Sequence, residues 1–374
     1  MLTRNEIAMF LERIIIRDFK NIESADISFS PKINCICGDN GEGKTNLLDA
    51  VYYLSMTKSF VSSGDKYALR HGSAELVLHG SYRRAGEQET VALSSKAAGE
   101  KTVKRNSKPY KRISDHIGRY PVVVVSPSDT SLIHDSGEER RRFINMMLSQ
   151  TDPAYLRSVV SYNRLLKQRN SLLKDGNFQE LLLDTISERM CPDAVYIYNK
   201  RSEASEMLDR ITSEMYTRIT GGKEAVSIKY RSDLSGRDAM GLFESGKARD
   251  RVMGFTTSGV QRDDFEFFMD GYPLRKCASQ GQQKSFIVAL KMAQYSVMKE
   301  VCGVSPVMLL DDLFDKLDNS RVRALIGLVL EDDFGQIFIT DTDAGRLAEI
   351  VEDMTDTGRF YSMSGGVVTE EGRR

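Results

Sequence analysis

The pattern of apolar and polar positions predicts two kinds of element along the chain. Runs of β-branched residues, and stretches in which apolar and polar residues alternate, are typical of strands. They predict strands at residues 11–17, 25–29, 33–37, 75–82, 90–93, 101–105, 122–125, 226–230, 265–269, 307–310 and 336–340. Short turns with glycine and serine separate the strands between 75 and 105, which favours an antiparallel meander.

Other segments carry apolar residues at helical spacing. They predict helices after Lys44, near Ser136, at 155–173, 179–219 and 235–251, and after Ser279. The turn Asp175-Gly176-Asn177 separates the two longest segments, so we expect an antiparallel helical hairpin. Pro192 is expected to kink or interrupt its second arm.

Length and composition narrow the class of protein. The 374 residues are enough for two or three domains, and the formal net charge of −1 means that any nucleic-acid binding must come from local patches. The sequence has no apolar run of about twenty residues and no signal-peptide pattern, which indicates a cytoplasmic protein. Its five cysteines and four histidines have no metal-ligand spacing, so neither a zinc site nor a disulfide framework is expected.

One glycine-rich stretch carries specific chemistry. Residues 38–45 fit the phosphate-binding pattern G-x-x-x-x-G-K-[ST] between an expected strand and an expected helix. Gly38, Gly41 and Gly43 permit turns that point successive N–H groups at a polyphosphate. Lys44 would place its charge on the β- and γ-phosphates and Thr45 its hydroxyl on Mg²⁺. The alternative is a strand–turn–helix that is glycine-rich for other reasons.

A second stretch supplies acids. The apolar run 307–310 ends in Asp311 and Asp312, and a buried parallel strand with an acid at its carboxyl end suits a Mg²⁺ site opposite Thr45. Asp311 would hold the metal, and Asp312 would orient or deprotonate the attacking water. The alternative is an ordinary strand end.

A third stretch, Ser279-Gln280-Gly281-Gln282-Gln283-Lys284, opens a helix. A serine and a glycine beside the free N–H groups of a first turn form an anion site. One γ-phosphate cannot occupy two such sites in one fold. The second site is therefore expected to bind the nucleotide held by a partner subunit. The alternative is an ordinary helix N-cap.

The meander carries the one marked basic cluster, a candidate for DNA contact. Its members are Lys96, Lys101, Lys104, Arg105, Lys108, Lys111 and Arg112. The alternative is a solvated hairpin edge whose lysines prevent pairing with other edges. Arg140 to Arg142 is a second candidate for the DNA surface.

Together these motifs resemble the RecF family of ABC/SMC-like ATPases over nearly the whole chain. The resemblance rests on residues 11–21, the phosphate-binding loop with Asn46, 58–60, 126–142, 162–170, 262–264, 279–284, 310–312 and Leu317-Asp318. The implied fold is α/β: a P-loop ABC/SMC-like ATPase head with an antiparallel β meander and an inserted helical-hairpin lid. The expected domains are the N-terminal part of the head at 1–135, the lid at 136–222 and the C-terminal part of the head at 223–374.

The resemblance also implies site residues. ATP and Mg²⁺ would lie on Gly38, Asp39, Asn40, Gly41, Glu42, Gly43, Lys44, Thr45 and Asn46. Thr45 and Asp311 would be the metal ligands, and Lys44 and Asp312 the catalytic residues. Ser279, Gly281 and Gln282 of one subunit would reach the γ-phosphate held by the other, which predicts an ATP-dependent two-fold homodimer.

The implied function is DNA replication and repair. Members of the family bind ATP and single-stranded or gapped DNA, act with RecO and RecR to load recombinase at gaps, and support the SOS response. Slow, DNA-stimulated ATP hydrolysis would act as a switch that releases the dimer. The alternative is the nucleotide-binding subunit of an ABC-type transporter, whose serine-glycine-glutamine motif is similar, although the chain has no membrane span of its own.

The chain departs from the family pattern at three places. Gln261 stands where a histidine is usual, and Asp315-Lys316 stands where Ser-Glu is common. Asp312 replaces the glutamate typical of ABC transporters, although Asp-Asp is familiar in the RecF family, and the shorter side chain fits slow turnover. Thr340 could sense the γ-phosphate in place of a histidine.

Overall fold

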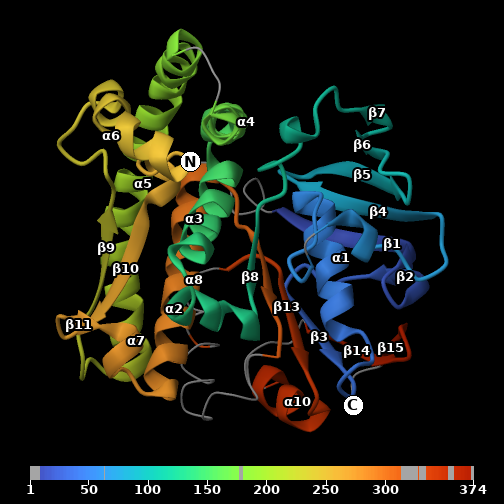
Figure 1. Cartoon of the computed structure of the whole chain (residues 1–374). Helices are drawn as coiled ribbons and strands as arrows, with labels where there is room; N and C mark the ends of the chain where they lie inside the picture. Colours follow the sequence, from blue (N-terminus) through green and yellow to red (C-terminus); the bar gives the residue numbers. More distant parts are fainter. Residues whose placement is uncertain are drawn as a thin grey trace. The chain divides into compact units, whose positions relative to one another are not determined.

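A computed structural model describes residues 9–62, 64–176, 180–312, 327, 334–352 and 358–371 (Figure 1). These residues form two compact units. The first comprises the described parts of Met1–Asp129, Arg218–Thr220 and Ile287–Arg374, and the second those of Thr130–Thr217 and Gly221–Phe286. Residues 223–286, which the sequence assigned to the head, lie in the same compact unit as the helical arm.

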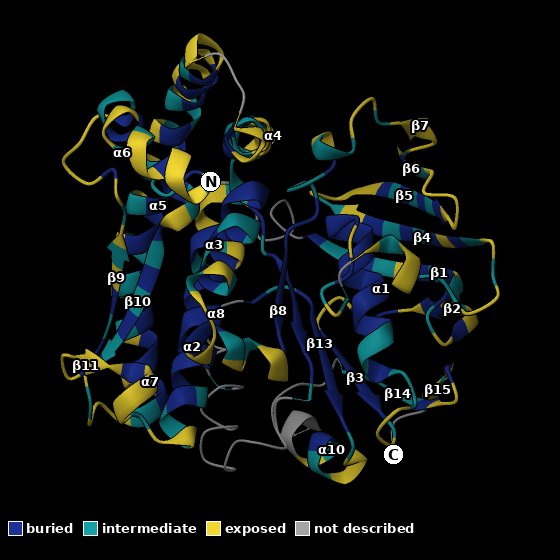
Figure 2. Cartoon of the chain, viewed as in Figure 1, coloured by how far each residue is buried: buried dark blue, intermediate teal, exposed yellow. Residues whose placement is uncertain are grey.

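The first unit contains a six-stranded sheet in the order β15-β14-β3-β13-β12-β8. All neighbours pair in parallel except β14 and β15. The strands are β3 (Ile33–Cys37), β8 (Val122–Val125), β12 (Val307–Leu310), β13 (Ile337–Asp341), β14 (Arg359–Ser364) and β15 (Val367–Glu371). The four predicted apolar strands are buried along their whole length, as parallel strands covered on both faces must be (Figure 2). The sequence reasoning missed β14 and β15.

A second six-stranded sheet of this unit is antiparallel, in the order β2-β1-β4-β5-β6-β7. The meander that the sequence predicts is confirmed. Its strands are β1 (Met9–Phe19), β2 (Ile22–Ser28), β4 (Glu75–Arg84), β5 (Glu87–Lys96), β6 (Lys101–Arg105) and β7 (Lys108–Pro109). Alternate residues of β1, β4 and β5 are buried, so one face of the sheet faces the core.

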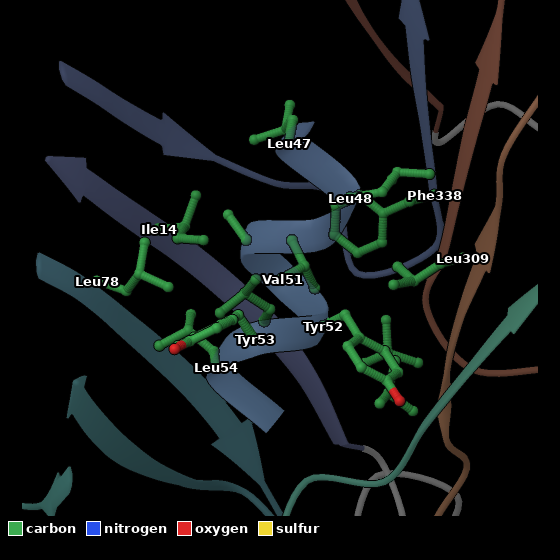
Figure 3. Packing of buried hydrophobic residues seen from close by; sticks show 14 of the residues in the cluster. Ile14, Leu47, Leu48, Val51, Tyr52, Tyr53, Leu54, Leu78, Leu309 and Phe338 are labelled. Atoms are coloured by element: carbon green, nitrogen blue, oxygen red, sulfur yellow. The ribbon is translucent and has the colours of Figure 1, made fainter. Parts of the chain in front are cut away.

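Helix α1 (Lys44–Met56) packs against both sheets. Figure 3 shows Ile14 and Leu78 of the antiparallel sheet on one side of α1, and Leu309 and Phe338 of the parallel sheet on the other. These residues belong to one buried cluster. Each such side chain stabilises the fold by about 1.5–3 kcal/mol when it leaves water, so the start of α1 is fixed in space. Helix α10 (Ala344–Glu352) follows β13.

The second unit is largely helical. Its helices are α2 (Ser131–His134), α3 (Gly137–Thr151), α4 (Pro153–Asp175), α5 (Glu180–Thr220), α6 (Ala239–Met253) and α7 (Leu274–Cys277), and the last three residues of α5 belong to the first unit. Helix α8 (Gln280–Cys302) begins in this unit and ends in the first. A three-stranded antiparallel sheet runs β11-β10-β9, with β9 (Val226–Arg231), β10 (Asp264–Met269) and β11 (Tyr272–Pro273). A short 3₁₀ turn of this unit occupies Val260–Arg262, and those at Asp65–Tyr67 and Ile113–Asp115 belong to the first unit; the turn Pro127–Thr130 lies at the boundary in the sequence.

Helices α4 and α5 form the predicted antiparallel hairpin. The carboxylate of Asp152 caps α4 by accepting from the N–H of Ala154 at 2.8 Å, and its other oxygen accepts the Tyr196 hydroxyl of α5 at 2.8 Å. Near the other end of α4, Arg169 Nε donates to Ser187 Oγ at 3.0 Å. Pro192 lies inside α5 and does not end it, so the expectation of an interruption is wrong. Residues 177–179 of the connection lie outside the described residues.

Two buried ion pairs tie the arms to the rest of this unit. Arg169 meets Asp250 at 2.7 Å, and Arg201 meets Asp263 at 2.6 Å, with none of the four side chains more than 4% exposed. Removing one partner of such a pair leaves an uncompensated buried charge, at a cost of about 3–5 kcal/mol. Asp263 of the Arg-Asp-Asp motif is therefore a structural residue of the second unit.

Candidate nucleotide-binding site

The glycine-rich loop connects β3 to α1 in the first unit. Gly41 and Gly43 have φ of 88° and 111°, a region that L residues with a side chain rarely adopt. A Cβ at Gly38 would lie 2.3 Å from the backbone oxygen of Met363 on β14. Both conformation and space thus require glycine, and the free N–H groups at the start of α1 belong to this loop.

Lys44 occupies the position expected of a phosphate-binding lysine. Its side chain is 4% exposed, and its Nζ donates to the backbone oxygens of Gly38 at 2.7 Å and Asp39 at 3.2 Å. The same ammonium lies 3.9 Å from Asp312 Oδ1. The charge is therefore held across the loop, where its donors can be transferred to phosphate oxygens.

Thr45 and Asp311 meet as the sequence predicts. The Thr45 hydroxyl donates to the Asp311 carboxylate, with Oγ1 2.9 Å from Oδ1 and 3.0 Å from Oδ2. Thr340 Oγ1 also donates to Asp311 Oδ1, at 2.9 Å. Parallel pairing of β12 with β13, and of β13 with β3, brings these residues to one edge of the sheet. Burial, together with the neighbouring charge of Asp312, raises the pKa of the Asp311 carboxyl.

This donor set fits Mg²⁺ better than a metal that needs a full protein cage. Mg²⁺ is usually held by one or two carboxylates together with water and phosphate oxygens. Asp311 and Thr45 offer such a partial set. Across the described residues, no group of three or more His, Cys, Asp or Glu side chains is placed to hold a metal ion.

Asp312 lies at the end of the same strand with a left-handed φ of 43°. Its N–H donates to Thr340 Oγ1 at 2.9 Å, so Thr340 positions both acids. Non-glycine residues persist in this region only where their surroundings fix them, commonly at functional sites. The expectations for Asp315-Lys316 and Leu317-Asp318 fall outside the described residues.

The sequence reasoning missed a clamp on the outside of the loop. Asn21, in the β1–β2 turn, donates from Nδ2 to Glu42 O at 3.0 Å and accepts from Asn46 Nδ2 at 2.8 Å. The Gly366 N–H in the β14–β15 turn donates to Glu42 O at 3.0 Å, and the Gly365 N–H donates to the Glu42 carboxylate. The pair Gly365-Gly366 is a hairpin signal that could have revealed this turn.

The signature segment, residues 279–284, lies in the second unit and has a local structure of its own. Ser279 Oγ accepts the Gln282 N–H at 3.3 Å, and Gln282 Oε1 accepts the Ser279 N–H at 2.7 Å. This reciprocal pair is a capping box. Gln282 Nε2 also donates to Glu224 Oε1 at 2.9 Å. Within one chain, then, the segment forms the N-cap that was the alternative interpretation, and Ser279 is exposed.

The basic cluster divides into paired and unpaired cations. Lys101 forms an ion pair with Asp65 at 2.6 Å and donates to Thr57 O, and Arg112 pairs with Asp115 at 3.0 Å. Lys104, Lys108 and Lys111 are exposed and form no ion pair with the described part of the chain, and Arg105 is half-buried. Lys108 and Pro109 form β7, the outermost strand of the antiparallel sheet. Lysine and proline at such a position also protect an edge from pairing.

The second basic candidate is mostly committed to structure. Arg140 forms a two-bond pair with Asp264 at 2.7 and 3.0 Å, and Arg141 donates to Asp263 O at 2.7 Å. Of these three arginines, only Arg142 is not tied to Asp263 or Asp264; its nearest acid is Glu139, at 3.9 Å.

Gln261, which stands where the family usually has a histidine, has a structural contact in this unit. It accepts the Tyr162 hydroxyl and donates to Ser258 O, so it holds the 3₁₀ turn Val260–Arg262.

Comparison with known proteins identifies the class. The family model described as the RecF/RecN/SMC N terminal domain matches residues 10–362. The Smc head domain of Pyrococcus furiosus superposes with a TM-score of 0.57 over 97% of this chain and 96% of that one; at 15% identity, this likeness concerns the fold alone. The predicted fold class, an α/β P-loop head of the ABC/SMC type with a helical insertion, is confirmed.

The chain belongs to the RecF family of DNA replication and repair proteins. It is 41% identical to the DNA replication and repair protein RecF of Porphyromonas gingivalis over 362 residues, which cover 96% of this chain and 100% of the relative. It is 39% identical to RecF of Parabacteroides distasonis over 360 residues, or 96% of this chain and 99% of that one. A structure described as the recombination mediator protein RecF with ATP in the RecFOR pathway matches with a TM-score of 0.89 and 26% identity, over 99% of this chain and 100% of that chain.

This membership decides against the transporter alternative. Among the helices that the structure describes, none is both long and apolar enough to cross a membrane.

Proposed function

We propose that the chain is a recombination mediator of the RecF type that binds ATP and DNA. Two copies close around two shared ATP molecules and, with RecO and RecR as partners, place recombinase at single-stranded gaps in the cytoplasm during repair and the SOS response. The observation that carries this proposal is the contact of Thr45 with Asp311 beside an intact phosphate-binding loop, in a chain of the RecF family.

Different residues of the first unit bind the triphosphate, hold the metal ion and activate water. The loop N–H groups from Gly38 to Thr45 bind phosphate oxygens, and Lys44 transfers its donors from the loop carbonyls to the β- and γ-phosphates. Thr45 and Asp311 hold Mg²⁺, which would neutralise charge that develops on the phosphates. Asp312 orients the attacking water and accepts its proton.

The residues of the signature segment act on the nucleotide of the other subunit. Ser279, Gly281 and Gln282 offer a hydroxyl, a backbone N–H and a side-chain amide at a helix start. The γ-phosphate is the group that both subunits bind, so its hydrolysis weakens the dimer. A slow, DNA-stimulated turnover then acts as a switch that releases the DNA.

A pair of substitutions tests the ATP switch. Lys44→Met removes the phosphate contact, so we expect at least a hundredfold loss of ATP affinity and no ATP-dependent dimer. Asp312→Asn keeps the shape of the site but removes the base, so ATP binds and the dimer persists without hydrolysis. Equilibrium ATP titration and analytical sedimentation, each with and without Mg-ATP, measure both outcomes.

The control is Lys66→Met, the same change at an exposed lysine outside the loop. It should behave as wild type. The proposal fails if the Lys44 and Asp312 variants sediment alike in Mg-ATP, or if wild type stays monomeric with saturating Mg-ATP and DNA.

The unpaired lysines of the basic cluster provide a test of DNA contact. Removal of one lysine that binds a DNA phosphate should lower the slope of log affinity against log salt by about 0.7–0.9. The triple substitution of Lys104, Lys108 and Lys111 by alanine should therefore reduce the slope by about 2–3. Fluorescence anisotropy on gapped, single-stranded and duplex DNA at several salt concentrations, with and without ATP, measures the slope.

The control removes paired cations of the same cluster. Lys96 lies 2.8 Å from Glu100 and Arg112 3.0 Å from Asp115, so Lys96→Ala with Arg112→Ala should change the slope less. An unchanged slope in the triple variant would assign these lysines to protection of the sheet edge instead.

A further inference from the structure

A polar pocket of about 400 Å³ lies in the second unit, outside the proposed nucleotide site. One wall is a face of α5, and the other is β9 with the loop that follows it. The α5 wall consists of Tyr198, Ser202, Ser205, Glu206 and Asp209. Their spacing of i, i+4, i+7, i+8 and i+11 places all five on one helical face.

This face of α5 is not used for apolar packing. A helix that packs against a sheet ordinarily presents an aliphatic stripe, and α5 does so on its neighbouring face with the buried residues Ala204, Leu208 and Ile211. The pocket face instead combines one aromatic ring, two hydroxyls and two carboxylates. Packing of the helix does not require these polar side chains, whereas a polar molecule bound in the pocket would use them.

The charges that face the pocket are negative. Glu206 is exposed and forms no ion pair or hydrogen bond with the described residues, and Asp209 Oδ1 accepts the Ile228 N–H at 2.6 Å. Lys229 also borders the pocket, but its ammonium lies 4.9 Å from the centre of the Phe268 ring. Alternation along β9 sends the Lys229 side chain to the face opposite Ile228 and Tyr230.

Ser205 adds an independent indication of a ligand. It lines the pocket, is only 4% exposed, and its hydroxyl has no hydrogen-bond partner within the described chain. Ser205 Oγ is not among the fully buried, unpaired oxygens of the described residues, so it is still reached from the pocket, and a molecule that enters the pocket can supply its hydrogen bond. The hydroxyl can accept from a donor that enters the pocket.

Two tyrosines complete the walls. The ring centroids of Tyr198 and Tyr230 are 5.8 Å apart at an interplanar angle of 32°. Tyr230 stacks on Phe265 at 4.9 Å, and its hydroxyl donates to Asp263 Oδ2 at 2.5 Å, so the position of its ring is fixed. Tyr198 is half-buried and keeps accessible ring surface at the pocket, and an aromatic ring attracts an organic cation.

We propose that this pocket binds a guanidinium or primary ammonium group. Glu206 and Asp209 would provide the charge, Ser205 an acceptor, and the two tyrosine rings the flanking surface. The same chemistry could arrive on an arginine or lysine side chain of a partner protein or as a free polyamine. The site is separate from the phosphate-binding loop and does not depend on ATP.

Calorimetric titration of the full chain with two probes tests the proposal. The probes are spermidine and a short neutral-ended peptide with one central arginine, and a peptide with a central glutamate serves as the negative probe. We expect saturable binding of at least one cationic probe and none of the glutamate peptide. Tighter binding of spermidine indicates a free polyamine, and tighter binding of the arginine peptide indicates a protein side chain.

Substitutions locate the binding. Glu206→Gln should weaken the cationic probe about tenfold, through removal of one charge-assisted hydrogen bond, and Ser205→Ala about threefold. The matched control is Glu203→Gln, on an exposed carboxylate one helical turn before Glu206, which pairs with Lys200 at 2.8 Å and does not line the pocket. It should bind as wild type.

Thermal melting of each variant separates loss of the site from loss of the fold. Both Glu206→Gln and Ser205→Ala are small changes at a pocket wall, so their melting temperatures should equal that of wild type. The proposal is overturned if neither cation binds wild type, or if a folded Glu206→Gln variant binds the probes as tightly as Glu203→Gln does.

Discussion

The two proposed halves of the ATP site differ in how much of their structure one chain completes. In the first half, Lys44 is buried, and the loop and Thr45 are held by Asp311 after β12, by the β1–β2 turn and by the β14–β15 turn. Thr340 of β13 in turn holds Asp311. In the second half, Ser279 is exposed and its contact to Gln282 is local. The fold therefore holds the first half in place before ATP binds. The second half is a capped helix start, and it acts as a binding site only when a phosphate approaches it.

This difference has an energetic consequence. The capping box already satisfies the Gln282 N–H and the Ser279 N–H. An incoming γ-phosphate must displace these neutral bonds, and its charge allows it to do so, because hydrogen bonds to charged groups contribute about 1.5–3 kcal/mol against about 1 kcal/mol for neutral ones. Exchange of partners at Ser279 is thus an expected part of dimer closure.

The largest expected effect separates capping from anion binding at Ser279. Aspartate caps a helix as well as serine does, but it would place a carboxylate where the γ-phosphate should lie. Ser279→Asp should keep the melting temperature and the affinity of the monomer for ATP, and should abolish the ATP-dependent dimer in sedimentation. Ser279→Ala should lower stability by about 1 kcal/mol through loss of the cap.

The two variants together decide the comparison. If Ser279→Asp dimerises with ATP as wild type does while Ser279→Ala is destabilised, the segment is an ordinary N-cap. The proposed second half of the site would then be wrong, and the loop at Lys44 would be unaffected.

A smaller effect is expected from the clamp on the first half. Asn21→Ala removes one donor to Glu42 O and one acceptor for Asn46, while leaving every predicted phosphate ligand in place. Loss of one to two neutral hydrogen bonds costs about 1–2 kcal/mol. Part of this should appear as a roughly fivefold to tenfold weaker ATP affinity, measured by equilibrium titration.

A second variant sharpens this test. Asn21→Asp keeps an acceptor for Asn46, but it loses the donor to Glu42 O and adds a negative charge beside the loop, so its ATP affinity should be lower than that of Asn21→Ala. Asn199→Ala, at an exposed position of α5, is the control. Equal ATP affinity in all four proteins would mean that the loop holds its shape without Asn21.

The sequence predicted those parts of the site that depend on local pattern. The loop spacing identified Lys44 and Thr45, and the rule that parallel strands end at one edge brought Asp311 to them. The clamp depends on a turn at Gly366, more than 300 residues along the chain from Asn21 and Glu42, and no periodicity shows such a contact.

The same limit explains the basic candidates. Lys101 and Arg140 stand in runs of positive charge, but their acidic partners, Asp65 and Asp264, are distant in the sequence. Pairing of this kind follows from the folded arrangement. Local charge counting therefore overstated how many of these cations are available to DNA.

The smallest expected effect is the pH dependence of Mg²⁺-assisted ATP binding, which depends on Asp311 in the first half of the site. Burial raises the pKa of Asp311, and Asp311 must be ionised to hold Mg²⁺. As pH falls from 7.5 toward 5, this carboxyl takes up a proton at a higher pH than an exposed aspartate would. The gain in ATP affinity that Mg²⁺ confers should therefore shrink, by about twofold at the pH where half of the Asp311 carboxyls are protonated.

Titration of ATP with Mg²⁺ and with EDTA at each pH measures this gain. ATP itself takes up protons in the same range, so Asp311→Asn provides the reference: its gain should be small at every pH, and the protonation of ATP affects it equally. If wild type and Asp311→Asn show the same Mg²⁺-dependent gain, the contact between Thr45 and Asp311 has no role in metal binding. The first half of the site would then be complete without its acid, and the contrast with the signature segment would rest on the loop and Lys44 alone.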